Sequence, residues 1–178
     1  MQFIKNGPDI PERLLQAHED GRVVFFCGAG ISYPAGLPGF RGLVDQIYAE
    51  LGTSRNAIED QAYKKEQYDA TLYLLEGRVA GKRAAVRAAL AKTLKPNLQL
   101  KGATSTHAAL LQLSRDHGNN VRLVTTNFDR IFETLIARTK PAVPSYPAPL
   151  LPIPKNSRWN GVVYLHGFSL PQDWIFTG

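Results

Sequence analysis

The sequence contains one cysteine, Cys27, and no long apolar run. A single cysteine cannot form an internal disulfide or build a cysteine zinc site, so we expect no zinc ribbon, no metal, and a reducing cytoplasm as the compartment. A transmembrane helix needs about eighteen or more consecutive apolar residues. Because the sequence has no such run, we expect no membrane-spanning helix. The segment 1–11 lacks an apolar stretch behind a basic start, so no secretory signal is expected either.

Acidic residues are absent from residues 77–103, although the whole chain has a net charge of only +6. This stretch carries seven basic residues: Arg78, Lys82, Arg83, Arg87, Lys92, Lys95 and Lys101. Val79, Val86, Leu90 and Leu94 recur at helical spacing. The pattern indicates an outer helix face exposed to solvent. The alternative is a surface for docking protein or nucleic acid, since clustered Lys and Arg suit phosphate binding.

The apolar pattern alternates between short strand-like runs and helical periods. Its 178 residues predict one domain, 1–178. Helical spacing occurs at 9–20, 40–51 and 104–115, at 57–94 with interruptions near Gly77 and Gly81, and through Ile131, Leu135 and Ile136. Apolar runs typical of strands occur at 22–27, which resembles a strand buried on both faces, and at 121–125 and 162–165. These patterns predict an α/β fold: a Rossmann-like parallel sheet with flanking helices and a helical insertion at roughly 52–100.

Six prolines fall within residues 141–154. Proline disfavours helices and central strands, so we expect an extended surface connection that flanks the active site. The alternative is a ligand for an SH3-type domain.

Each predicted strand is followed by residues suited to binding or catalysis. Gly28 follows the first strand, Asn127 and Asp129 follow the second, and His166 follows the third. In open parallel α/β sheets, ligands bind at the carboxyl ends of the strands. We therefore expect these residues to meet at one edge, and Asn127 and His166 to project from strand ends and not to lie in the core.

The turn Gly28-Ala29-Gly30 lets backbone amides approach a pyrophosphate, although a structural turn explains such a pair equally well. The hydride-transfer version of this motif needs a third glycine, where this chain has Tyr33. That motif also needs an acid at a set separation along the sequence to contact the ribose. Asp45 and Glu50 lie near that separation, but they are on a predicted helix. A dehydrogenase is therefore disfavoured.

Three segments together resemble the sirtuin family. The segment GAGISYPAGLPGFR at 28–41 is similar to the sirtuin cofactor loop, TTNFD at 125–129 to its second motif, and LHG at 165–167 to the strand end with the catalytic histidine. They occur in the family's order over residues 22–167. The resemblance implies binding of NAD and cleavage of its bond between nicotinamide and ribose.

The resemblance also implies roles for individual residues. Phosphate contacts would come from Gly28, Ala29, Gly30 and Ser32, and the cofactor loop would be lined by Phe40 and Arg41. Thr126 belongs to the second motif, in which Asn127 would orient the ribose or the attacking water and Asp129 would contact the nicotinamide amide. His166 would act as general base, since histidine titrates close to neutrality.

Purely structural roles are open to the same residues. Asn127 could cap the following helix, Asp129 could stabilise its start through the helix dipole, and His166 could be a turn residue. We expect His107 to be a structural hydrogen bonder, His18 and His117 to be surface residues, and Cys27 to be a small core residue.

Departures from the deacylase pattern favour water as the nucleophile. Gly39 stands where deacylases usually carry aspartate, and paired zinc cysteines are absent. We therefore expect an NAD hydrolase. The alternatives are an NAD-dependent deacylase or ADP-ribosyl transferase, and a non-catalytic module that senses NAD or ADP-ribose.

The resemblance extends to biological role and partners. Zinc-free sirtuin-like proteins of this kind often deplete NAD in bacterial antiphage defence, commonly with an Argonaute-like or helicase-like ATPase partner. We expect such a partner, a homo-oligomer, no membrane, and nucleic acid only through the partner or the basic helix. The chain stops twelve residues after His166, so we also expect a longer polypeptide or another segment to complete the sheet.

Overall fold

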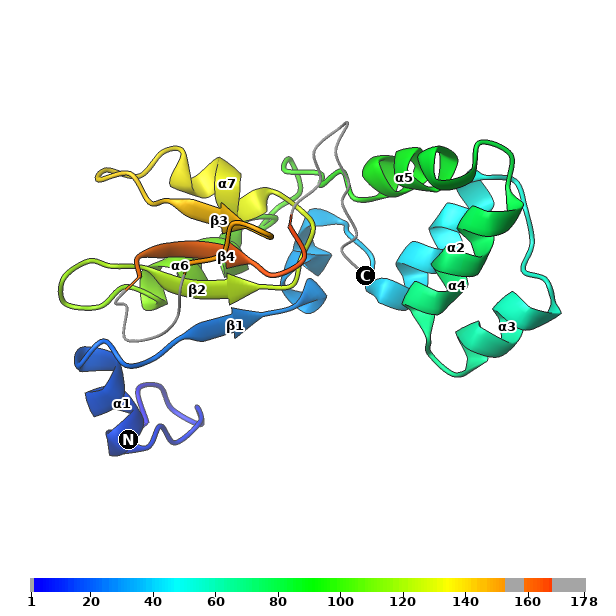
Figure 1. The fold of residues 1–178 in the computed structure, drawn as a ribbon. Coiled ribbons are helices and arrows are strands. Elements are labelled where there is room, and N and C mark those ends of the chain that lie inside the picture. The colour runs from blue at the N-terminus through cyan, green and yellow to red at the C-terminus, as the bar shows by residue number, and fades with distance from the viewer. Residues whose placement is uncertain (1, 153–158, 168–178) are drawn as a thin grey trace. The chain divides into compact units, whose positions relative to one another are not determined.

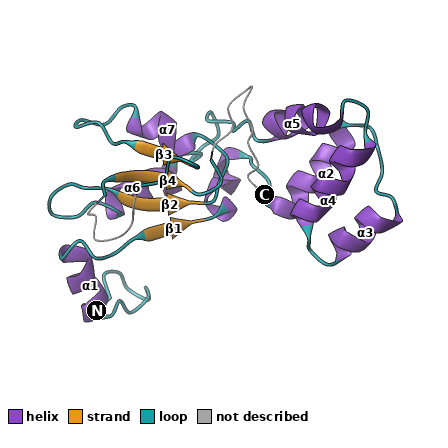
Figure 2. Cartoon of the chain, viewed as in Figure 1, coloured by secondary structure: helices purple, strands orange, loops and turns teal. Residues whose placement is uncertain are grey.

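The computed structural model describes residues 2–152 and 159–167 (Figure 1). Contacts divide the chain into two compact units. The sheet unit comprises Met1–Gly28, Ser105–Asn127 and Ile131–Gly167, and the described part of the helical unit comprises Ala29–Thr104 and Phe128–Arg130. Figure 2 shows the described strands within the sheet unit, whereas the helical unit consists of helices and loops. The expected boundaries of a helical insertion at 52–100 stay a prediction.

Four short strands form one parallel sheet. They are β1 (Phe25–Cys27), β2 (Arg122–Thr125), β3 (Ser145–Pro147) and β4 (Gly161–Tyr164). Their order is β1-β2-β4-β3, and each neighbouring pair is parallel (Figure 1). The prediction of an α/β fold with a parallel sheet is therefore confirmed, and the architecture is consistent with a Rossmann-like fold.

The two inner strands supply the core of the sheet. All four residues of β4 are buried, including the β-branched Val162 and Val163. On β2, burial is complete at Leu123 and Thr125 and partial at Arg122 and Val124. A strand flanked by two others and covered on both faces favours such a continuous apolar run.

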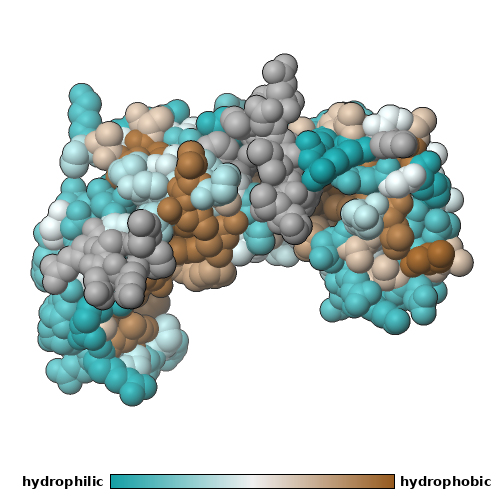
Figure 3. Space-filling view, viewed as in Figure 1, coloured by the Kyte–Doolittle hydropathy of each residue, from teal (hydrophilic) through white to brown (hydrophobic). Residues whose placement is uncertain are grey.

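Strand β1 differs from the prediction. The apolar run 22–27 predicts a strand buried on both faces, but only Phe25–Cys27 is strand, and the Phe26 side chain is 66% exposed. Val24 is also exposed, and Figure 3 shows a hydrophobic area on the visible face of the sheet unit. Among the described strands, β1 pairs with β2 alone. An apolar run does not distinguish an edge strand from a central one.

The proline-rich segment also contains a strand that the sequence did not predict. Residues 145–147 form β3, which pairs with β4 and lies at the other end of the described sheet. Proline is tolerated in an edge strand, because its missing N–H can face away from the ladder. The Pro144 carbonyl accepts a hydrogen bond from Val162, and Ala148 donates to Tyr164. The described part of 141–154 is thus not merely a surface connection, and residues 153–154 lie outside the described residues.

Three helices belong to the sheet unit: α1 (Glu12–Glu19), α6 (Ser105–Leu113) and α7 (Ile131–Ile136). The α6 and α7 helices meet where the buried His107 ring packs edge-on against Phe132, with centroids 4.8 Å apart. The boundaries of α6 lie within the predicted range 104–115, and α7 contains Ile131, Leu135 and Ile136, through which the sequence predicts a helix.

The helical unit contains η1 (Ala29–Ala35, a 3-10 helix), α2 (Phe40–Glu50), α3 (Ala57–Lys64), α4 (Tyr68–Arg78) and α5 (Lys82–Thr93). Its apolar core joins one face each of α2, α4 and α5. The core residues on these faces include Leu43, Val44, Ile47, Leu72, Leu75, Val86 and Leu90. Among the described residues, no helix is long and apolar enough to cross a membrane.

The basic stretch 77–103 finds acidic partners from other segments. Arg78 pairs with Glu59 at 2.8 Å, and Lys92 pairs with Glu50 at 2.6 Å. Val86, Leu90 and Leu94 are buried, as the helical spacing predicts. These pairs neutralise part of the charge, which favours the interpretation of a solvent-exposed helix face.

Glu59 connects α3 to α4 inside the helical unit. Its fully buried carboxylate accepts hydrogen bonds from Arg78 Nε at 2.8 Å and Nη2 at 2.9 Å, and from the backbone N–H of Asn56 at 2.9 Å. Asn56 in turn caps α3, which completes a capping box. Burial alone would raise the pKa of Glu59, but the bonds from Arg78 and Asn56 outweigh it and lower that pKa below its usual value.

Replacement of Glu59 tests this connection. We expect Glu59→Ala to lower the free energy of unfolding by about 3 kcal/mol, because it leaves a charged partner without compensation and removes half of a capping box. Urea denaturation followed by circular dichroism measures the change. Lys64→Ala is the control: it removes an exposed pair with Asp60, and it should change stability by less than about 0.5 kcal/mol. Equal effects of the two substitutions would contradict the proposed role of Glu59.

Candidate functional site

The ends of β1, β2 and β4 lie side by side at one edge of the sheet. Cys27 is in register with Thr125, and Thr125 with Tyr164. The pairing continues one residue further, because Thr126 N–H donates to the Cys27 carbonyl and Leu165 N–H donates to the Thr125 carbonyl, both at 3.0 Å. The carboxyl ends of three strands therefore form a continuous row.

Gly28, Asn127 and His166 belong to this row. Asn127 and His166 each stand two residues beyond a register pair, on chain ends that leave neighbouring strands, and neighbouring strands are about 4.8 Å apart. Gly28 lies opposite Thr126, whose hydroxyl is the nearest atom to a Cβ built on the glycine, at 3.8 Å. The structure thus brings these four predicted site residues to one edge.

The surroundings of Asn127 and His166 differ. His166 is exposed, as expected for a residue that leaves a strand end. Asn127 is only 6% exposed, so the expectation that both side chains lie outside the core is wrong for Asn127. Its backbone N–H donates to Thr125 Oγ1 at 3.1 Å. Helix α7 begins at Ile131, which puts Asn127 three residues before the N-cap position. Asn127 therefore does not occupy the capping position.

The glycines of the turn are not required by the protein's own packing. Neither Gly28 nor Gly30 has a left-handed φ, and a Cβ at Gly30 would meet no atom within 4 Å. Gly161 is the opposite case: its φ is 147°, and a Cβ there would lie 2.5 Å from the Pro144 carbonyl oxygen. Neither a left-handed backbone conformation nor a close packing contact therefore requires glycine at 28 or 30.

Ser32 and Asp129 form a pair within the helical unit. Ser32 Oγ donates to Asp129 Oδ2 at 2.7 Å, although the residues are 97 positions apart. Both side chains are buried, at 2% and 4% exposure. The sequence marked both as site residues but did not reveal their contact, because no local pattern links a serine in a 3-10 helix to an acid beyond a distant strand. The hydrogen bond fixes the orientation of the Asp129 carboxylate.

Phe40 and Arg41 are the first two residues of α2, and both are exposed. The Phe40 ring packs against Tyr68, with centroids 5.5 Å apart. Arg41 Nε donates to the Tyr63 hydroxyl at 3.1 Å. This hydrogen bond raises the pKa of the Arg41 guanidinium. Neither tyrosine carries a sequence signal that marks it as a partner of these two residues.

The remaining cysteine and histidines have other surroundings. Cys27 is buried, and burial raises the pKa of its thiol, as expected for a core residue. His107 is fully buried against Phe132, which supports a structural role. His117 is exposed, but His18 is half-buried: its Nε2 lies 2.6 Å from the Leu113 carbonyl oxygen, so it is not a simple surface residue. Within residues 2–152 and 159–167, no cluster of three His, Cys, Asp or Glu side chains could hold a metal.

Comparison with known proteins identifies a SIR2-like domain at residues 121–178. The chain is also 38% identical over 165 residues to an uncharacterised protein, y4cA, of Sinorhizobium fredii (strain NBRC 101917 / NGR234). The match covers 90% of this chain but 14% of that protein, so the chain spans only a small part of its relative. No solved structure matches the chain. The match at residues 121–178 supports a relationship of this segment to the sirtuin-like family. It also suggests an NAD-related activity, since SIR2-like domains are typically NAD-dependent enzymes.

Gly30, where a Cβ would meet open space, and Gly161, where it would clash, can be compared in a stability test. We expect Gly30→Ala to leave the free energy of unfolding unchanged or to raise it by about 0.5 kcal/mol, because alanine restricts the unfolded chain and meets open space in the folded one. Gly161→Ala should lower it by about 3 kcal/mol through backbone strain and a clash with Pro144. Thermal and urea denaturation measure both. A destabilised Gly30→Ala would show that the fold itself requires this glycine.

Proposed function

We propose that the chain is the core of an NAD glycohydrolase, which cleaves the bond between nicotinamide and ribose and yields nicotinamide and ADP-ribose. The observation that carries the proposal is the shared edge of the parallel sheet. Gly28, Asn127 and His166 come from three motifs far apart in the sequence, and their strands are adjacent. The carboxyl edge of a parallel sheet is where α/β proteins bind dinucleotides.

Open space at Gly30 and around Gly28 fits a bound pyrophosphate. A residue without a Cβ lets a ligand phosphate approach the backbone amides closely. A Cβ at Gly30 would meet no atom within 4 Å, and one at Gly28 would meet only the Thr126 hydroxyl, at 3.8 Å. The resemblance assigns phosphate contacts also to Ala29 and Ser32, gives Thr126 a place in the second motif, and assigns Phe40 and Arg41 to the cofactor loop. Asp129, held by Ser32, is proposed to accept a hydrogen bond from the nicotinamide amide.

The proposed reaction replaces a carbon–nitrogen bond with a carbon–oxygen bond. Water attacks the anomeric carbon of the ribose, and the electrons of the broken bond return to the pyridinium nitrogen, so that nicotinamide leaves uncharged. His166 accepts the proton that the water loses. Asn127, fixed by burial at the next strand end, orients the water or the ribose hydroxyls.

Two features favour water over an acyl-lysine as the attacking group. The paired zinc cysteines of deacylases are expected soon after the catalytic histidine, and residues 167–178 contain none. At Gly39, where deacylases usually carry aspartate, a Cβ would lie 2.7 Å from the Tyr33 hydroxyl oxygen. A tyrosine side chain therefore stands where that aspartate would begin.

We further propose a role in antiphage defence through depletion of cytoplasmic NAD. In this proposal the domain works as a homo-oligomer with a sensor partner such as an Argonaute-like protein or a helicase-like ATPase. The relative in Sinorhizobium fredii is several times longer than this chain, which is compatible with a catalytic domain joined to further domains.

Incubation of the full-length protein with NAD tests the activity. We expect nicotinamide and ADP-ribose to form in equal amounts, at a rate that acetylated peptide does not change. Separation of the products by liquid chromatography measures both. Release of nicotinamide only with acetylated peptide would indicate a deacylase instead, and binding of NAD without turnover would indicate a sensing module.

Substitutions at the sheet edge test the assigned roles. We expect His166→Ala and Asn127→Ala to lower kcat at least about 100-fold, because one removes the proton acceptor and the other the orienting amide. His117→Ala is the matched control, since His117 is an exposed histidine of the sheet unit that precedes β2 and so lies away from the carboxyl edge. Circular dichroism checks the folding of each variant. Wild-type activity in His166→Ala, whose exposed side chain is not needed for packing, would reject the role of this residue.

A further inference from the structure

Arg41 is held at a defined position by a residue of another helix. Its Nε donates to the Tyr63 hydroxyl at 3.1 Å, and its guanidinium carbon lies 5.5 Å from the centroid of the Tyr63 ring. No other hydrogen bond or ion pair joins Arg41 to the described residues, so both Nη groups keep their donors for a ligand. The side chain is therefore anchored at one nitrogen and available at the other two.

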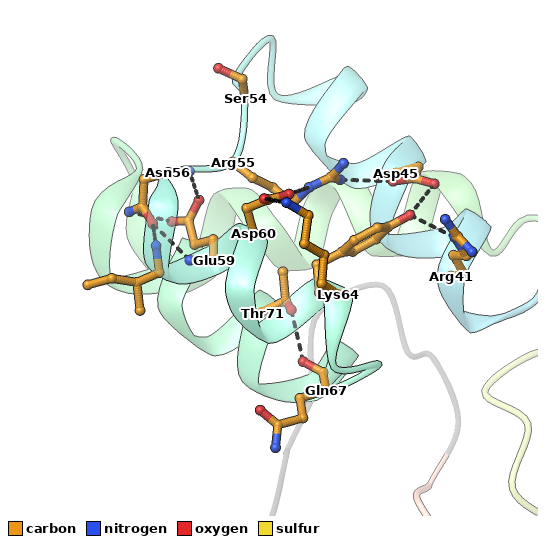
Figure 4. Close-up of polar contacts among 12 residues, drawn as sticks. Arg41, Asp45, Ser54, Arg55, Asn56, Glu59, Asp60, Lys64, Gln67 and Thr71 are labelled. Atoms are coloured by element: carbon orange, nitrogen blue, oxygen red, sulfur yellow. Dashed lines mark hydrogen bonds and ion pairs between the residues drawn. The ribbon is translucent and has the colours of Figure 1, made fainter.

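Tyr63 is itself held by charged side chains, of which Arg41, Asp45 and Arg55 are labelled in Figure 4. Its hydroxyl donates to Asp45 Oδ2 at 2.8 Å while it accepts from Arg41. The guanidinium of Arg55 lies over the Tyr63 ring, 3.8 Å from its centroid, and also donates to Asp45 Oδ1 at 2.9 Å. Tyr63 is only 8% exposed. With its ring stacked and its hydroxyl bonded on both sides, Tyr63 offers Arg41 a rigid acceptor.

Phe40, the other residue that the resemblance assigns to the cofactor loop, is also supported by a tyrosine. The Phe40 ring packs against Tyr68, and Tyr68 packs edge-on against Tyr63 with centroids 5.6 Å apart. Tyr63 comes from α3 and Tyr68 from α4. Both residues that the resemblance assigns to the cofactor loop thus contact tyrosines from this pair of helices.

We propose that Tyr63 is a positioning residue that presents Arg41 to a phosphate of the bound dinucleotide. An arginine side chain that is free in solution loses rotamer entropy when it binds, and this loss weakens the affinity. The hydroxyl of Tyr63 restricts Arg41 before the ligand arrives, so less entropy is lost on binding. The guanidinium then forms charge-assisted hydrogen bonds with phosphate oxygens through its Nη groups. This inference rests on the proposed function, since it requires that the chain binds NAD.

Removal of one hydroxyl tests the proposal. Tyr63→Phe keeps the ring under Arg55 and beside Tyr68 but removes the hydroxyl that accepts from Arg41 and donates to Asp45. We expect the KM for NAD and the Kd for ADP-ribose to rise about three- to tenfold, while kcat stays within about twofold. Binding of nicotinamide riboside, which has no pyrophosphate, should not change. Tyr73→Phe is the matched control, because Tyr73 is 76% exposed on α4 and its hydroxyl has no described partner.

A double-mutant cycle separates positioning from a general effect on folding. We expect Arg41→Ala to weaken ADP-ribose binding at least as much as Tyr63→Phe, and Tyr63→Phe to add nothing in the Arg41→Ala background. A further loss in that background, or unchanged affinity in Tyr63→Phe alone, would overturn the positioning role and leave the proposed function standing. If the wild-type chain neither binds nor cleaves NAD, the proposed function fails, and the inference fails with it.

Discussion

Parallel pairing of the strands is the constraint on which the candidate site depends. Each strand of a parallel sheet ends at the same edge, so residues that follow different strands are brought together whatever their distance in the sequence. Here, hydrogen bonds from Thr126 to Cys27 and from Leu165 to Thr125 extend the row beyond the strands. This ladder places the chain ends that carry Asn127 and His166 next to each other.

The inner part of the sheet could be predicted from the sequence. Strands β2 and β4 both occupy inner positions and were predicted as strands; all four residues of β4 are buried, whereas on β2 burial is complete only at Leu123 and Thr125. The edges could not be predicted in the same way. Phe26 on β1 is apolar but exposed, and β3 lies in a proline-rich segment whose composition argues against a strand. The amino-acid composition of a segment does not determine whether it forms a strand, because strand pairing depends on which segments lie beside it.

The site shows the same division. Strand ends followed by glycine, asparagine and histidine are local signals, and from them the sequence predicted which residues would share an edge. The contacts of Ser32 with Asp129 and of Arg41 with Tyr63 join residues 97 and 22 positions apart. They depend on how helices pack, which a single sequence does not encode in any short pattern. Tyr63 in particular looks like an ordinary apolar-face residue of α3 until its hydroxyl is placed.

The buried carboxylate of Glu59 makes the helices that support Phe40 and Arg41 sensitive to acid. Because its pKa is lowered in the folded chain, Glu59 contributes its full stabilisation above its unfolded value of 4.5 and loses it as the pH falls through the lower, folded value. Protonation would weaken both the bond to Arg78 at the end of α4 and the closed start of α3. Acidification would thus loosen the two helices that carry Tyr68 and Tyr63, and with them the order of the loop residues they support.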